Sequence, residues 1–154
     1  MRRVLLALVS LLIVVQVIPY GRDHSNPPVT REPKWNSAET KATFERACAD
    51  CHSHQTTWPW YSRVAPVSWL VQHDVDEGRS NFNASAVLAK DEGHEAAEEV
   101  TKKNMPPKIY LLGHPQARLT DGERKAFAVG LDATFGRGRG VEEGVLGEKS
   151  GYLD

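Results

Sequence analysis

The first apolar stretch of the chain predicts a helix at the amino terminus. Residues 4–18 are apolar except for Ser10 and Gln16, and two arginines precede them. A positive end followed by an apolar run is typical of an export signal. The run also lacks the polar face of a soluble surface helix. We therefore expect residues 1–20 to be a signal anchor or a signal peptide.

The fate of this segment depends on whether a signal peptidase can cut it. Residues 15–21 contain no pair of small residues with the spacing of a cleavage site, which favours retention as a single-span anchor. The run is nevertheless shorter than the roughly 20 residues that span a bilayer comfortably. We expect an inner-membrane anchor with the arginines in the cytoplasm and the remaining chain on the periplasmic or extracytoplasmic side. A cleaved signal peptide is the alternative.

Proline and polar residues dominate residues 21–34, which include Pro27, Pro28 and Pro33. A segment of this composition is extended and semi-rigid. We expect a linker that lifts the following domain off the membrane. The alternative is a strap that packs against the domain.

Helical periodicity begins after this linker. We expect Asn36 to cap a helix and Glu39 to complete a capping box. The positions that follow at helical spacing are Phe44, Ala47, Cys48 and Cys51. One helix face would then carry an aromatic core residue together with both cysteines.

A second helix is predicted after Pro66, which suits a first helical turn, and extends to about Val75. Residues 77–83 are expected to form a polar turn. Asn83 is then expected to cap a helix that starts at Ala84.

Two further helices are predicted in the second half of the chain. Residues 96–103 are rich in alanine, glutamate and lysine, and a capping box at residues 120–123 precedes another helix. That last helix carries Phe127 and Leu131 four residues apart, and we expect it to cross the first helix closely with Phe127 near Phe44. The fold class is therefore all-α.

The pattern divides the chain into an amino-terminal segment, the linker, a helical domain over residues 35–135 and a glycine- and glutamate-rich flexible tail over residues 136–154. A length of 154 residues suits one such domain. The formal net charge is −1 and no basic stripe stands out, so nucleic acid is not an expected partner.

The clearest chemical signal is Cys48-Ala49-Asp50-Cys51-His52. This pattern covalently attaches a c-type haem. Each sulfur can add across one haem vinyl group, and the imidazole of His52 can supply a nitrogen to the iron. A thiol–disulfide redox pair is the alternative, although such pairs usually follow a strand and no strand pattern precedes this motif. With only two cysteines in the chain, four-thiolate zinc and iron–sulfur sites are excluded.

Met105 is the expected second axial ligand of the iron. It is the only methionine after the initiator, and Pro106 and Pro107 follow it. A thioether is a neutral, soft ligand that raises the reduction potential. A methionine that only fills a gap in the core is the alternative.

Three histidines compete with Met105 as candidates for the sixth ligand. His54 is too close to His52 in sequence to reach the opposite haem face. His73 and His114 remain open, and His114 is also a candidate for a structural hydrogen bond. The acidic cluster at residues 91–95 is expected to be a solvated break between helices rather than a metal site.

Three of the four tryptophans lie within twelve residues, directly after the cysteine motif: Trp58, Trp60 and Trp69. We expect them to wall a haem crevice and to keep water from the iron. Ordinary core aromatics are the alternative, and the two interpretations overlap because a haem would belong to this core.

The order of the motifs between residues 47 and 131 resembles that of the haem-binding domain family of small bacterial c-type cytochromes. These motifs are C-A-D-C-H-S, T-x-W-P-W-Y-S, A-P-V-S-W-L, E-G-R, M-P-P, Y-x-L-x-H-P and L-T-x-x-E. The resemblance implies a membrane-tethered, mostly helical domain that is similar to a small cytochrome c and surrounds one haem.

Together these observations predict a c-type cytochrome with one covalent haem c (iron) per chain and His52/Met105 axial ligation. We expect one-electron transfer with a redox protein partner, haem attachment by the cytochrome c maturation machinery, and no catalytic residues. The alternative is a haem peroxidase or a haem-based gas sensor with a displaceable sixth ligand. In a peroxidase, His73 or His114 would serve as distal acid–base groups.

Overall fold

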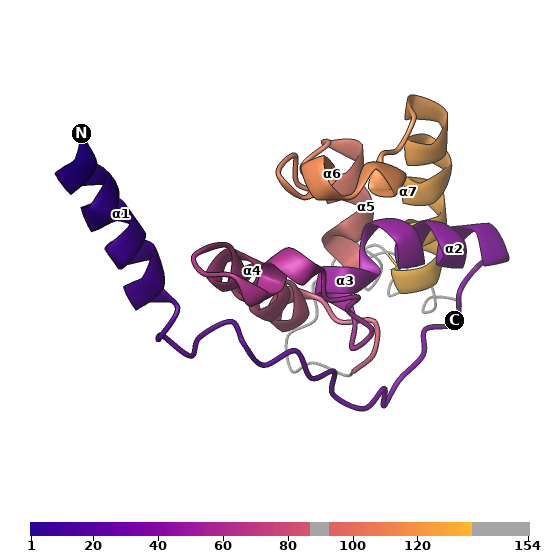
Figure 1. Ribbon diagram of the computed structural model, residues 1–154. Helices are drawn as coiled ribbons and strands as arrows, with labels where there is room; N and C mark the ends of the chain where they lie inside the picture. Colours follow the sequence, from indigo (N-terminus) through magenta and orange to yellow (C-terminus); the bar gives the residue numbers. More distant parts are fainter. Residues whose placement is uncertain (87–92, 137–154) are drawn as a thin grey trace, which may run out of the picture.

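The computed structural model describes residues 1–86 and 93–136, and within them all regular structure is helical. The predicted all-α fold class is therefore confirmed (Figure 1). Apart from Gly136, the predicted tail lies outside the described residues. The α-helices are α1 (Arg2–Val15), α2 (Ala38–Ala47), α3 (Ala49–His52), α4 (Val67–Asn81), α5 (Ala96–Thr101), α6 (Tyr110–Gly113) and α7 (Asp121–Phe135). The 3₁₀ helices are η1 (Trp60–Arg63), η2 (Gly93–Glu95) and η3 (Pro115–Ala117).

Helix α2 has a different cap from the predicted one. Ser37 is the N-cap, and its side chain accepts a hydrogen bond from the backbone N–H of Thr40 at 3.1 Å. The predicted capping box of Asn36 and Glu39 is therefore wrong. The helix begins one residue later than predicted, and the hydroxyl of Ser37 satisfies the otherwise unpaired N–H of Thr40 in the first turn. The backbone N–H of Asn36 instead donates to Oγ1 of Thr134 in α7.

Helix α4 is longer than predicted. It continues to Asn81, so that most of the predicted polar turn at residues 77–83 is helical. Gly78 is tolerated there because α4 packs closely on α3: a Cβ at this position would lie 2.6 Å from the carbonyl oxygen of Cys51. The glycine allows this close approach, so its low helix propensity does not end the helix.

No helix begins at Ala84, contrary to the prediction. The side-chain oxygen of Asn83 accepts a hydrogen bond from the backbone N–H of Ser85 at 2.8 Å. Residues 84–86 form a turn and a bend. Asn83 therefore stabilises a tight turn.

The predicted crossing of the last and first helices of the domain is confirmed. The capping box of Thr120 and Glu123 is present at the start of α7. Phe44 and Phe127 belong to one buried cluster, and a Cβ at Gly130 would lie 2.1 Å from Oγ1 of Thr40. Glycine therefore lets α7 lie directly against α2.

The segment between α1 and α2 is a strap that packs on the domain, the alternative left open by its proline-rich sequence. It runs beneath α4 and α3 in Figure 1. The ring of His24 stacks on Trp58 with centroids 4.6 Å apart, and the backbone N–H of Thr30 donates to the carbonyl of Ser85 at 2.9 Å. These contacts replace the predicted free tether.

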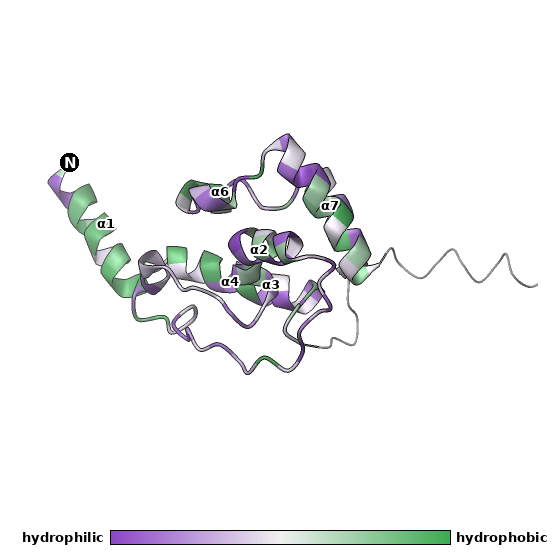
Figure 2. Cartoon of the chain, turned by 90° about the vertical axis from the view of Figure 1, so that its right-hand side faces the viewer, coloured by the Kyte–Doolittle hydropathy of each residue, from purple (hydrophilic) through white to green (hydrophobic). Residues whose placement is uncertain are grey.

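Helix α1 stands away from the rest of the molecule, is mostly hydrophobic along its length (Figure 2), and buries none of its 14 residues. Among the described residues, no helix has both the length and the apolar content needed to cross a bilayer. Anchoring by residues 1–20 therefore stays a prediction.

Candidate functional site around His52

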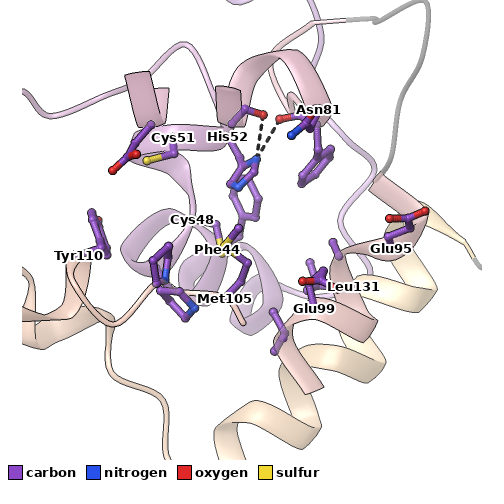
Figure 3. A pocket seen from close by; sticks show the side chains of 18 of the residues that line it. Phe44, Cys48, Cys51, His52, Asn81, Glu95, Glu99, Met105, Tyr110 and Leu131 are labelled. Carbon is purple, nitrogen blue, oxygen red and sulfur yellow. Dashed lines mark hydrogen bonds between the residues drawn. The ribbon is translucent and has the colours of Figure 1, made fainter. Parts of the chain in front are cut away.

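A cavity of about 360 Å³ lies between the helices of the domain. Its lining includes Cys48, Cys51, His52 and Met105, the four residues that the sequence analysis assigned to haem attachment and iron ligation. The first three come from the α2–α3 junction, and Met105 comes from the loop between α5 and α6. Figure 3 shows His52 and Met105 in the middle of this lining, with Tyr110 on one side and Glu95 and Glu99 on the other.

The imidazole of His52 is held by two backbone carbonyls. Nδ1 lies 3.1 Å from the oxygen of Gly78 and 3.1 Å from the oxygen of Phe82, as drawn in Figure 3. A carbonyl can only accept a hydrogen bond, so Nδ1 carries the proton and Nε2 keeps its lone pair. Burial lowers the pKa of His52, which keeps the ring neutral. This is the tautomer and charge state of a histidine that ligates a metal through Nε2.

Neither cysteine is poised for thiolate chemistry. Cys48 and Cys51 are not joined by a disulfide, and burial raises the pKa of each thiol to about 12. Reactive redox pairs need a lowered thiol pKa. The environment therefore favours neutral thiols facing the cavity over the redox pair considered above.

Met105 is held in place by its own backbone. Its N–H donates to the carbonyl of Glu99 at 3.2 Å, and its carbonyl accepts a hydrogen bond from Arg124 at 3.1 Å. The side chain is partly buried and packs on the core cluster. The loop between α5 and α6 thus positions the thioether of Met105 at the cavity, whereas a methionine that only fills the core more often lies on the buried face of a helix.

The remaining lining consists mainly of hydrophobic and acidic side chains. Its hydrophobic members include Phe44, Phe82, Val100, Pro106, Pro107 and Leu131, and its acidic members are Asp74, Glu77, Glu95 and Glu99. No lysine or arginine lines the cavity in the part of the chain that the structure describes. Carboxylates around the site favour the more positive, oxidised state of an iron held there.

The predicted role of the three tryptophans as walls of the crevice is corrected by the structure. Trp58, Trp60 and Trp69 do not line the cavity, and Trp60 is 78% exposed. Trp58 is stacked on the strap. Trp69 precedes Gly78 by nine residues, which places it about half a turn away around α4 from the face that meets α3.

The fourth tryptophan, which the sequence analysis did not select, supports the cavity indirectly. Trp35 packs against the buried cluster and lies 4.9 Å from Phe44, centroid to centroid. Phe44 in turn lines the cavity. No local pattern around Trp35 indicates this role, because it depends on where α2 is placed.

The competing histidines lie outside the cavity lining. His73 is exposed, and its Nε2 lies 3.4 Å from Glu77. His54 contacts the strap, where one of its ring nitrogens lies 2.8 Å from the carbonyl of Pro28. His114 stacks on Tyr110 with centroids 3.9 Å apart and has the structural role predicted for it.

Two positions that the sequence analysis did not assign tie the motif to distant segments. Tyr110 donates a hydrogen bond to Asp50 at 2.7 Å, and burial, followed by this bond, raises the pKa of its hydroxyl. Arg79 donates to the carbonyl of Ser53 at 2.9 Å and to Oγ1 of Thr56 at 2.9 Å. The Y-x-L-x-H-P and E-G-R motifs contain these residues and are the signals that could have found them.

The acidic cluster at residues 91–95 falls partly outside the described residues, and its described part forms η2. Within residues 1–86 and 93–136, no group of three or more histidine, cysteine or acidic side chains could hold a metal ion.

An all-helical domain with such a cavity is consistent with a small helical haem protein. Two thiols, an imidazole with a free Nε2 and a thioether around an apolar cavity are the donors that fit this cofactor. The family model described as "Haem-binding domain" matches residues 10–132, and the chain belongs to this family. The match extends from within α1 through the strap to α7. Neither a curated protein nor a solved structure matches the chain.

Proposed function

We propose that this protein is a c-type cytochrome that carries one covalently bound haem and transfers single electrons. The observation that carries the proposal is the convergence of Cys48, Cys51, His52 and Met105 on one cavity. A haem bound there would supply the one-electron couple of ferric and ferrous iron.

Each residue has a separate task in this proposal. Cys48 and Cys51, whose neutral thiols line the cavity, would tether the cofactor by adding across its vinyl groups to form thioethers. His52 would bind the iron through Nε2, and the carbonyls of Gly78 and Phe82 keep its ring oriented. Met105 would offer its thioether to the iron from a loop whose backbone is held by hydrogen bonds to Glu99 and Arg124.

We favour an electron carrier over a peroxidase or a gas sensor. A peroxidase needs a polar distal group, and the two histidines considered for that role, His73 and His114, lie outside the cavity lining. Among the described residues, His52 is the only histidine in the lining, which combines Met105, two prolines and apolar side chains with four carboxylates. Such a lining suits an iron that exchanges electrons without binding a substrate.

The cellular setting follows from the amino terminus in this proposal. Two arginines and an exposed apolar helix attach the protein to the inner membrane, with the domain on its extracytoplasmic side. The cytochrome c maturation machinery would attach the haem there. A redox protein of that compartment would exchange the electron.

Two measurements on the purified holoprotein test this proposal. Extraction with acidic acetone should leave the pigment with the polypeptide, because thioethers survive this treatment. The ferric spectrum should contain a weak charge-transfer band at long wavelength that marks sulfur ligation. Pigment that leaves with the solvent would contradict covalent attachment.

Substitution identifies the sixth ligand. Met105→Ala should abolish the long-wavelength band and allow rapid carbon monoxide binding to the reduced protein. His73→Ala is the matched control, since that exposed histidine lies outside the lining, and it should leave both properties unchanged. A band that persists in Met105→Ala would refute methionine ligation.

A further inference from the structure

We propose that the domain itself rests on the membrane surface through the face next to α1, in contact with anionic lipid headgroups. This inference depends on the proposed membrane attachment through residues 1–20. It differs from attachment through a flexible tether because the domain would have a fixed side against the bilayer.

The end of α1 is tied directly to the domain. The side-chain amide of Gln16, one of the two polar interruptions of the apolar run, donates to the carbonyl of Ala65 at 2.8 Å. Its oxygen accepts a hydrogen bond from the backbone N–H of Ala65 at 3.0 Å. These two hydrogen bonds fix the end of α1 directly to the residues that precede α4.

Gly21 provides a second point of close contact. Its φ is +75°, and a Cβ there would lie 2.5 Å from the carbonyl oxygen of Ser68. A glycine is therefore required for the chain to turn and lie against the first turn of α4. With Gln16 and Gly21 both held, the chain cannot move the domain far from the membrane that α1 enters.

Exposed apolar side chains surround this attachment point. Trp60, Val64, Val67 and Leu70 lie within five residues of Ala65, and each is at least 43% exposed. Helix α6 lies beside η1, since a Cβ at Gly113 would be 2.8 Å from Oη of Tyr61. Two more exposed apolar residues, Ile109 and Leu112, come from the α6 region. We call these six residues the α1-side face.

The charge distribution favours an anionic surface as the occupant of this face. The chain has no acidic residue from Cys51 to His73 and none from Val100 to Thr120. Arg63 and Lys108 are exposed within these two segments. Basic side chains near a membrane are attracted to lipid phosphates, and tryptophan prefers the interface between water and hydrocarbon. The continuity of the α1-side face with the apolar helix favours lipid over a protein partner.

The experiment uses the full-length holoprotein in vesicles of phosphatidylcholine and phosphatidylglycerol. The native cysteines are consumed by haem attachment in the proposed holoprotein, so a single new thiol can be labelled with a water-soluble maleimide. Val67→Cys places it on the α1-side face, and Val129→Cys is the matched control on α7, where the valine is 68% exposed. Flotation of the vesicles reports membrane attachment separately.

We expect both variants to float with the vesicles and Val67→Cys to react about tenfold more slowly than Val129→Cys, because an interfacial thiol is shielded from the aqueous reagent. In vesicles of phosphatidylcholine alone this protection should weaken. Equal labelling rates in floating protein would overturn the inference and leave the proposed attachment intact. Failure to float would overturn both, and protection that depends on protein concentration would assign the face to a second copy of the chain.

Discussion

Asp50 links the cysteine motif to two other parts of the molecule. One of its carboxylate oxygens accepts a hydrogen bond from the backbone N–H of Thr57 at 2.8 Å, and the other accepts one from the hydroxyl of Tyr110 at 2.7 Å. His114 stacks on the same tyrosine ring. A residue that the motif leaves variable in type therefore holds α6 against the cysteine motif.

Removing the tyrosine hydroxyl should weaken this link. We expect Tyr110→Phe to lower the free energy of unfolding of the holoprotein by about 1.5–3 kcal/mol, as for hydrogen bonds to charged groups. The measurement is urea unfolding. Tyr20→Phe is the control, because Tyr20 is 46% exposed and should show no change. Equal midpoints for both variants would contradict the role given to Tyr110.

The same substitution should alter the pH dependence of stability. The pKa of Tyr110 is raised in the folded state, first by burial and then by the bond to Asp50. The stabilisation it provides is present below the unfolded-state pKa of about 10 and is lost as the pH rises through the folded-state pKa. The alkaline loss of stability should therefore be smaller in Tyr110→Phe than in the wild type.

At the scale of elements, the packing of α4 on α3 determines how His52 is presented. Both elements are needed: α3 carries the imidazole, and the end of α4 supplies the carbonyls of Gly78 and Phe82 that hold Nδ1. The approach is close enough that only glycine fits at position 78. The E-G-R motif therefore orients the imidazole of His52.

Adding a side chain at Gly78 should push α4 away from α3. Gly78→Ala would place a methyl group 2.6 Å from the carbonyl oxygen of Cys51, and we expect a loss of about 1–3 kcal/mol in unfolding free energy from overpacking. A shift in the absorption spectrum should accompany it as His52 is displaced. Gly122→Ala in α7 is the control, since a Cβ there meets nothing within 4 Å. Comparable stability of the two variants would show that the contact relaxes without cost.

For the whole molecule, the strap makes the amino-terminal segment part of the domain. Arg79 connects three regions, because it reaches Ser53 and Thr56 after the motif and the side chain of Asn26 in the strap, the last at 3.0 Å. Burial lowers the pKa of this guanidinium, and the hydrogen bonds compensate for the lost hydration. The family match beginning at residue 10 agrees with a strap that belongs to the folded unit.

Replacing the planar guanidinium of Arg79 with the ammonium of a lysine should weaken its contacts with the strap and with the residues after the cysteine motif. Arg79→Lys keeps the charge but cannot reach all three acceptors in the same geometry. We expect a loss of about 1–3 kcal/mol and faster proteolysis of residues 21–34, measured on the holoprotein in detergent. Arg63→Lys is the control at an exposed position. Unchanged cleavage in Arg79→Lys would mean that other contacts hold the strap.

The sequence by itself determined the features that depend on neighbouring residues. The cysteine and histidine spacing predicts the chemistry of the site because all three residues lie within five positions. The capping box at Thr120 and Glu123 formed as predicted because both partners belong to one helical turn. Met105, the only methionine after the initiator, was a chemical signal of the same local kind because two prolines follow it directly.

Only the tertiary structure decided which distant segments meet. It brought Met105 to the cavity of His52, left Trp60 exposed outside that cavity, laid the strap on the domain and extended α4 through Gly78. Each outcome depends on contacts between residues far apart in the chain, and local propensity carries no information about them. Gly78 lies in a segment whose sequence predicts a turn, yet it is helical because a glycine there allows α4 to pack closely on α3. Tertiary packing thus outweighs the low intrinsic helix propensity of glycine.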